Sequence, residues 1–148
     1  MRKSNMLFPM LLVLVGTGNA LAQSIDQVTK LPNEIEFQAP LRPGSPPAVV
    51  LYGDMTKQGL YVYRVKFPAG FKVMPHWHGE ERTFVVLSGT LHMGIGESWD
   101  ETKLKAYPAG SFLSEPPKLP HFTWAKDGEV ILQITGIGPA STTSTPAR

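Results

Sequence analysis

Residues 48–138 consist of short β-type segments separated by turn residues, and this pattern constrains the fold more than any other feature of the chain. The clearest segment is LYVYRVKF, in which every second residue is large and apolar or aromatic. Successive side chains of a strand point to opposite faces, so four of them share one face: Tyr61, Tyr63, Val65 and Phe67. No stretch in this range has the period of a long helix. The sequence therefore predicts an all-β fold, a small antiparallel β-barrel or sandwich.

The segments on either side of this range are predicted to lie outside the barrel. In residues 1–22, two basic residues precede an apolar run, and Ala-Leu-Ala follows it, an order typical of a signal peptide that is removed on export. Residues 23–47 are polar and rich in proline, and we expect them to form an N-terminal arm laid over the domain. Residues 139–148, PASTTSTPAR, have the low complexity of a disordered tail.

The charge of the chain argues against two classes of partner. The whole sequence has 14 Lys and Arg against 12 Asp and Glu, but Arg2 and Lys3 belong to the predicted leader, which leaves 12 of each sign. A near-neutral chain without a basic run has no electrostatic attraction for nucleic acid or for an anionic membrane. We therefore expect a protein that binds neither. The predicted leader indicates that it is periplasmic or secreted.

The absence of cysteine removes other possibilities. The sequence contains none, so the protein has no disulfide, no thiolate chemistry and no thiolate metal ligand. Its stability must come from its core and from any metal that it binds.

Three of the four histidines occur where β-type segments begin. His76 and His78 are separated by one residue, so in a strand both imidazoles point to the same face and can share a metal ion. His121 begins a later segment, and antiparallel pairing can bring it alongside the first two. A histidine at the start of a strand is more often only a polar residue at the rim of a sheet. The residues around the three histidines must therefore decide whether they form a metal site.

That context resembles the cupin superfamily. The spacing Gly70, five residues, His76-x-His78 and then Gly89 is similar to the first cupin motif, and Gly110, five residues, Pro116 and then His121 is similar to the second. The resemblance is to small, single-domain bacterial cupins and covers most of the chain after the arm. It implies a jelly-roll barrel, also called a double-stranded β-helix, with a metal held by these three histidines and commonly by a glutamate.

The predicted site departs from the family at that glutamate, because the position four residues after the second histidine is Arg82. In one interpretation the metal is held by the three histidines and solvent. In another, a β-bulge turns Glu81 into the ligand position. In a third, the site is vestigial and binds no metal. Beside a divalent cation, Arg82 would need a carboxylate partner, an anionic substrate or a different orientation.

The sequence leaves the function open between two main classes. One is an exported, metal-binding cupin with a small-molecule pocket, working as an oxygenase, isomerase or decarboxylase. Arg82, by holding a substrate carboxylate, and His92, by moving a proton, are its candidate catalytic residues. The other is a non-catalytic binding or sensing module in which metal is optional. A third reading is a barrel that serves only for dimerisation.

The expected cofactor is a divalent transition metal, and Fe, Mn, Ni, Zn and Cu all remain open because imidazole binds several of these ions. A small-molecule ligand and a homodimer are the expected partners, the homodimer by resemblance to other small cupins.

Overall fold

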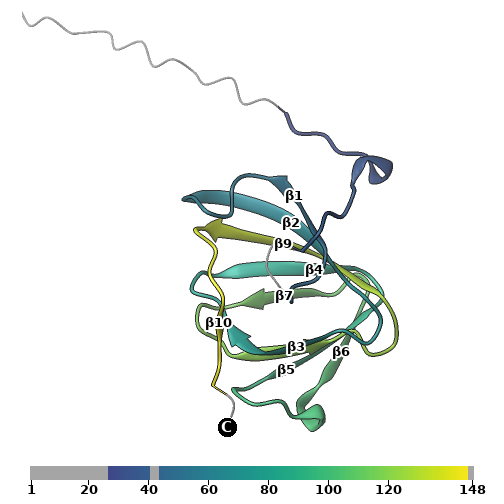
Figure 1. Cartoon of the computed structure of the whole chain (residues 1–148), viewed down its shortest axis with the longest axis vertical. Coiled ribbons are helices and arrows are strands. Elements are labelled where there is room, and N and C mark those ends of the chain that lie inside the picture. The colour runs from purple at the N-terminus through teal and green to yellow at the C-terminus, as the bar shows by residue number, and fades with distance from the viewer. Residues whose placement is uncertain (1–26, 41–43, 147–148) are drawn as a thin grey trace, which may run out of the picture.

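Two five-stranded antiparallel sheets face each other in the computed structural model, which describes residues 27–40 and 44–146 (Figure 1). The first sheet contains, in spatial order, β1 (Ala48–Tyr52), β2 (Gly59–Phe67), β9 (Val130–Gly138), β4 (Arg82–Ser88) and β7 (Phe112–Glu115). The second contains β10 (Thr143–Ser144), β3 (Lys72–Trp77), β8 (His121–Trp124), β5 (Thr90–Ile95) and β6 (Lys105–Pro108). The only helical elements of the described ranges are two 3₁₀ turns, η1 (Pro32–Glu34) and η2 (Glu101–Lys103). The prediction of a small antiparallel β-barrel of the jelly-roll type is confirmed.

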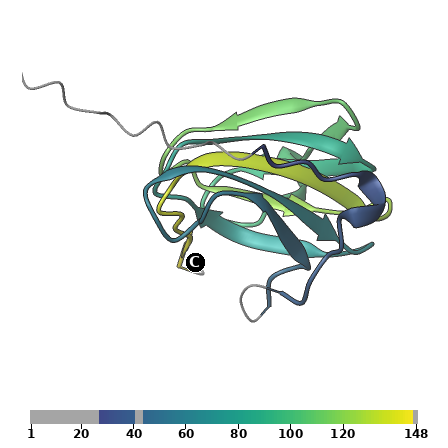
Figure 2. The same cartoon turned by 90° about the horizontal axis from the view of Figure 1, so that it is seen from above.

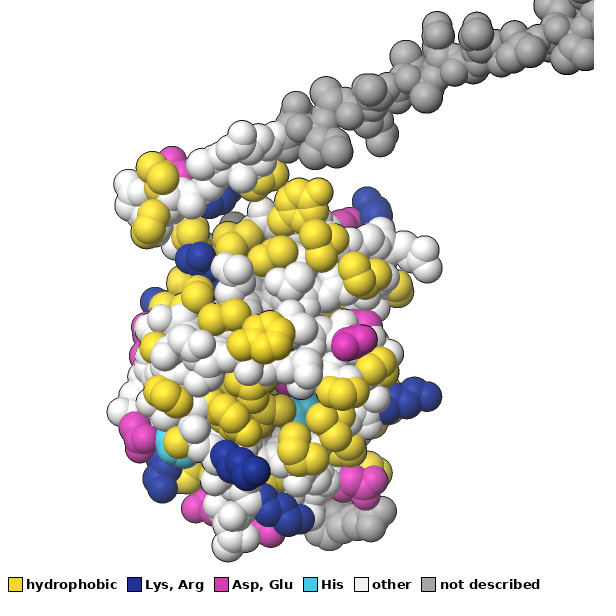
Figure 3. Space-filling view, turned by 180° about the vertical axis from the view of Figure 1, so that it is seen from behind, with side chains coloured by type: hydrophobic (Ala, Val, Ile, Leu, Met, Phe, Trp, Pro, Cys, Tyr) yellow, Lys and Arg dark blue, Asp and Glu magenta, His cyan; other side chains and the backbone are white. Residues whose placement is uncertain are grey.

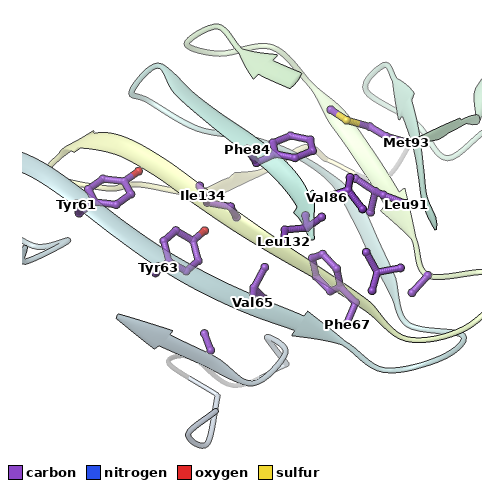
Figure 4. Packing of buried hydrophobic residues seen from close by; sticks show 13 residues of the cluster. Tyr61, Tyr63, Val65, Phe67, Phe84, Val86, Leu91, Met93, Leu132 and Ile134 are labelled. Atoms are coloured by element: carbon purple, nitrogen blue, oxygen red, sulfur yellow. The ribbon is translucent and has the colours of Figure 1, made fainter. Parts of the chain in front are cut away.

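The core lies between the two sheets and uses the alternation seen in the sequence. The predicted inner face of β2 is buried along its whole length, from Tyr61, which is fully buried, to Phe67. Figure 4 shows these side chains meeting Ile134 and Leu132 of β9 and, from the other sheet, Leu91 of β5. Burying large apolar side chains between two sheets supplies the main driving force for folding.

The segments before β1 are the predicted leader and the predicted arm. The predicted leader, 1–22, lies outside the described residues. The described part of the arm contains η1 and touches the first sheet through a bridge between Gln38 and Ala48. In the ranges that the structure describes, no helix is long and apolar enough to cross a membrane.

The prediction of a disordered tail is wrong for residues 139–146. Thr143 and Ser144 form β10, which pairs with Trp77 and His76 at the edge of the second sheet (Figures 1 and 2). The Ala140 N–H also donates to the carbonyl of Met55 at 2.7 Å. A polar, low-complexity composition does not prevent order when backbone hydrogen bonds to distant strands are available.

Gly89 connects β4 of one sheet to β5 of the other in a left-handed conformation, with φ of +74°. A Cβ atom at this position would lie 2.2 Å from the backbone oxygen of Glu129. Gly110 has a similar φ of +90°, but nothing lies within 4 Å of the place of its Cβ.

Gly89 and Gly110 provide a matched test of the turn between β4 and β5. We expect Gly110→Ala to lower the free energy of unfolding by about 1 kcal/mol, the cost of a left-handed alanine. Gly89→Ala adds a backbone clash, so its loss should reach about 3 kcal/mol or more. Chemical denaturation of both variants measures the difference, and equal losses would contradict this account of the turn.

Candidate metal centre

The three predicted histidines come together between the sheets. His76 of β3 lies directly opposite His121 of β8 in the strand register, and a bulge between Val73 and His76 adjusts the pairing there. His78 follows β3 by one residue and points the same way as His76. All three side chains are buried, and one nitrogen of each lies within 4.8 Å of those of the other two. The predicted convergence of His121 on the first pair is confirmed.

Backbone carbonyls determine which nitrogen each ring offers. The Nδ1 atoms of His76, His78 and His121 lie 2.8 Å, 2.8 Å and 3.0 Å from the carbonyl oxygens of Met74, Ser141 and Leu119 respectively. A carbonyl oxygen can only accept a hydrogen bond, so each Nδ1 carries the proton. Each neutral ring therefore presents the lone pair of Nε2. Hydrogen bonds of this kind orient imidazoles for metal binding.

The surroundings keep these rings neutral. Burial, with smaller contributions from nearby positive groups, lowers the pKa of His76 to about 4 and that of His78 to about 2. Burial also lowers the pKa of His121, although Glu115 opposes the shift. The Nε2 atom of His78 is buried and has no hydrogen-bond partner among the described residues. Three converging, neutral nitrogen donors, one of them otherwise unsatisfied, fit a divalent transition metal.

Arg82 points into the same space and has a carboxylate partner that the sequence did not reveal. Its Nε donates to Oε2 of Glu115 at 2.5 Å, and its Nη1 donates to the hydroxyl of Tyr63 at 3.3 Å. Both charged side chains are buried. Burial opposes the charged form of Arg82, but Tyr63 and Glu115 outweigh it and raise the pKa of the guanidinium. Of the three outcomes considered for Arg82, the carboxylate partner is the one found.

Glu115 also contacts the histidines. It ends β7 directly opposite Arg82 in the strand register, and its Oε1 lies 3.0 Å from Nε2 of His121. The one sequence signal for this residue is a glutamate at the end of a β-type segment and before two prolines. Its pairing with Arg82 joins two residues that are 33 positions apart in the chain. A local sequence pattern cannot predict such a contact.

The prediction that Glu81 assists the metal site is wrong. Glu81 is exposed and does not line the cavity between the sheets, so the proposed bulge does not turn it inward. Glu80 is the one that turns toward the cavity. It accepts hydrogen bonds from the hydroxyl of Tyr61 and the backbone N–H of Ser141, each at 3.0 Å.

His92, a candidate for proton transfer, also lies elsewhere. It alternates with the buried Leu91 and Met93 of β5, so its ring is on the outer face of the second sheet. There its Nε2 lies 3.5 Å from a carboxylate oxygen of the exposed Asp127. The structure does not bring His92 together with the three histidines, and it corrects that expectation.

The cavity beside the histidines has a volume of about 940 Å³. One part of its lining consists of the histidines, Arg82, Glu115 and Glu80, and many of the other lining residues are apolar or aromatic, among them Phe67, Leu91 and Ile134. In Figure 3 a histidine is visible in a hollow surrounded by hydrophobic side chains. The cavity therefore combines a polar group of side chains around the histidines with a largely apolar wall between the sheets.

Comparison with known families places the chain in a family defined by sequence. A model described as "Domain of unknown function (DUF4437)" matches residues 33–143. The chain belongs to this family. The matched range includes both histidine motifs and Glu115, and extends into β10. The comparison with curated proteins found no match.

Solved structures with a similar fold include an RmlC-like cupin and two enzymes. The polyketide cyclase RemF of Streptomyces resistomycificus has a TM-score of 0.62 at 13% identity, over 76% of this chain and 82% of the cyclase. An RmlC-like cupin of Shewanella frigidimarina has a TM-score of 0.58 at 18% identity, over 76% and 91%. An oxalate oxidase in complex with glycolate has a TM-score of 0.56 at 19% identity, over 85% and 68%. The resemblance to RmlC-like cupins is thus confirmed at the level of the fold.

The lowered histidine pKa values predict how acid affects the protein after a chelator has removed divalent metal. Unfolded His76 titrates near 6.5, whereas the folded ring titrates at about 4, so the unfolded state takes up the proton first. Stability should be complete above pH 6.5 and fall as the pH drops toward 4, by about 3 kcal/mol for His76 alone. Denaturation at a series of pH values should show a smaller loss in His76→Gln, and identical profiles would refute this explanation.

The buried ion pair predicts strong coupling between its two members. Arg82→Met leaves the Glu115 carboxylate buried without its cation and should lower the free energy of unfolding by about 3–5 kcal/mol. Replacing both residues by Met should recover most of that loss, because no buried charge then lacks a partner. A double-mutant cycle by chemical denaturation measures the coupling. Additive losses would show that the two side chains act independently.

Proposed function

We propose that this protein is a metal-dependent cupin that binds a small organic molecule in the cavity between its sheets. The observation that carries the proposal is the set of three buried Nε2 donors in the polar part of that cavity. A buried cluster of neutral imidazoles lining a cavity of this size is the arrangement expected of a site that binds a metal and a small molecule.

The cofactor we propose is a divalent transition metal held by His76, His78 and His121. Imidazole nitrogen suits Zn, Cu, Fe and Ni, and this donor set does not select among them or exclude Mn. When bound, the metal would supply Lewis-acid or oxygen chemistry in the polar part of the cavity. The chain's own residues would hold the ion, orient the ligand and keep water away through the apolar wall.

The ligand we propose has an apolar body and an oxygen-bearing head. The cavity is also lined by residues such as Phe67, Leu91 and Ile134, which favour an apolar body. Glu115 pairs with Arg82 and offsets its charge, so a substrate carboxylate would meet an ion pair and not an unpaired cation. We therefore favour a neutral oxygen function at the metal over the carboxylate anchor that the sequence suggested.

The reaction class we propose is oxygenation, isomerisation or decarboxylation. The similar folds include a polyketide cyclase and an oxalate oxidase, which supports an enzyme in general terms. One observation favours the alternative, a non-catalytic binding module. The two carboxylates beside the histidines are both engaged, Glu80 with Tyr61 and Ser141, and Glu115 with Arg82 and His121, so neither is free as a general base.

We also propose that the protein is exported and forms a homodimer. The leader pattern of residues 1–22 supports export to the periplasm or medium, and N-terminal sequencing of protein from that fraction tests it. Sedimentation of the mature protein tests the dimer. Neither property is needed for the metal site.

Metal content tests the central proposal. We expect purified protein to contain about one divalent transition metal ion per chain by elemental analysis, and His121→Ala to lose it, because a three-nitrogen site would be reduced to two. His92→Ala is the matched control, since His92 lies on the outer face and should leave the metal content unchanged. A protein without metal, even after incubation with Zn²⁺ or Fe²⁺, would refute the proposal.

A further inference from the structure

Glu115 is the buried carboxylate nearest to the metal-binding face of the histidines. It is only 3% exposed, and the described residues give it two partners, Arg82 on Oε2 and His121 on Oε1. The first partner compensates its charge and holds one oxygen in place. The second contact is with Nε2 of His121, the nitrogen that the ring offers to a metal.

This second contact brings two acceptors together. Nδ1 of His121 donates its proton to the carbonyl of Leu119, so Nε2 of the neutral ring is a bare lone pair. Oε1 of Glu115 is a carboxylate oxygen and also only accepts. Two such atoms 3.0 Å apart repel each other unless a cation, either a proton or a metal ion, lies with them.

The distance suits a shared metal ion. Two donors, each at about 2.1 Å from one ion and at right angles to each other, are separated by about 3.0 Å. This matches the distance from Nε2 of His121 to Oε1 of Glu115. His76 and His78 each place a ring nitrogen within 4.8 Å of that of His121. The Glu115 carboxylate is outside that group, so it must turn toward these two rings when a metal binds.

We propose that Glu115 is a ligand of the metal, so that the donor set is three imidazoles and one carboxylate from β7. This inference rests on the proposed function, since it requires a metal at the three histidines. Oε1 stays near Nε2 of His121 and turns toward the other two rings to reach the ion, while Oε2 keeps its hydrogen bond to Arg82. Arg82 is then a positioning residue: it orients the carboxylate and does not touch the metal.

The arrangement also explains how a cation and a buried arginine can share one site. A divalent ion and a guanidinium repel each other strongly in a low-dielectric interior unless a negative charge lies between them. Glu115 is placed between Arg82 and His121 and supplies that charge. Without a carboxylate at this place, the arginine would weaken metal binding.

The test uses full-length mature protein, stripped with chelator and titrated with Co²⁺ and with Zn²⁺ alone. The key variant is Arg82→Gln with Glu115→Gln, which removes both charges and so avoids an unpaired buried arginine if Glu115→Gln alone fails to fold. Glu81→Gln is the matched control, because that glutamate is exposed. Circular dichroism verifies that each variant is folded.

We expect the double variant to bind Zn²⁺ more than about 100-fold more weakly than the wild type, beyond the range typical of residues that only support a ligand. Its Co²⁺ absorption spectrum should change, because the donor set changes. Glu81→Gln should alter neither measurement. Two results would overturn the inference: wild-type affinity in the double variant, or weaker binding with an unchanged Co²⁺ spectrum, which would make Glu115 a positioning residue only.

The same titrations separate this inference from the proposed function. If the wild type binds Zn²⁺ through the histidines and the double variant gives an unchanged spectrum, only the role of Glu115 is refuted. If the wild type binds no metal, or if His121→Ala binds it equally well, the proposed function itself fails.

Discussion

The buried ion pair between Arg82 and Glu115 is the interaction on which the rest of the interior depends. It joins β4 to β7 within one sheet and, through Glu115, reaches His121 of the other sheet. Removing two charges from water is costly, so such a pair is tolerated only when its geometry satisfies both groups. A slip of one residue between β4 and β7 would turn one member outward and leave the other buried alone. The pair therefore specifies the strand register at the polar end of the barrel.

The histidines depend on a second set of constraints, made by backbone groups. The segment after β9 supplies the carbonyl of Ser141 that orients His78, and Gly79 allows it to approach, because a Cβ there would lie 2.5 Å from the Ser141 hydroxyl. On the other side, the N–H of Lys118 donates to the carbonyl of His78 at 2.7 Å from a left-handed conformation, with φ of +61°. That conformation costs about 1 kcal/mol for a residue other than glycine. The position of His78 thus depends on two segments distant in the sequence.

Much of this could be predicted, because it follows from local periodicity and spacing. The alternation in β2 indicated its buried face, and the spacing of His76, His78 and His121 indicated a shared site. The correction for His92 follows from alternation within β5, whereas the other differences concern contacts between distant segments. The role of Glu115 depends on the register of β7 against β4, and the order of residues 139–146 depends on hydrogen bonds to β3 and to Met55. Neither leaves a periodic signal in the sequence.

The contrast between the two glutamates after His78 shows how contacts with distant segments determine which side chains reach the site. Glu80 is drawn toward the cavity by Tyr61 and by the N–H of Ser141, so its neighbour Glu81 faces solvent. β4 then begins at Arg82, which alternation directs inward. An inward arginine beside three imidazoles requires a buried negative charge. The residue opposite it on β7 can supply that charge with the least distortion of the sheet. The order of residues from 80 to 82, together with the ordered segment after β9, therefore accounts for a carboxylate on β7.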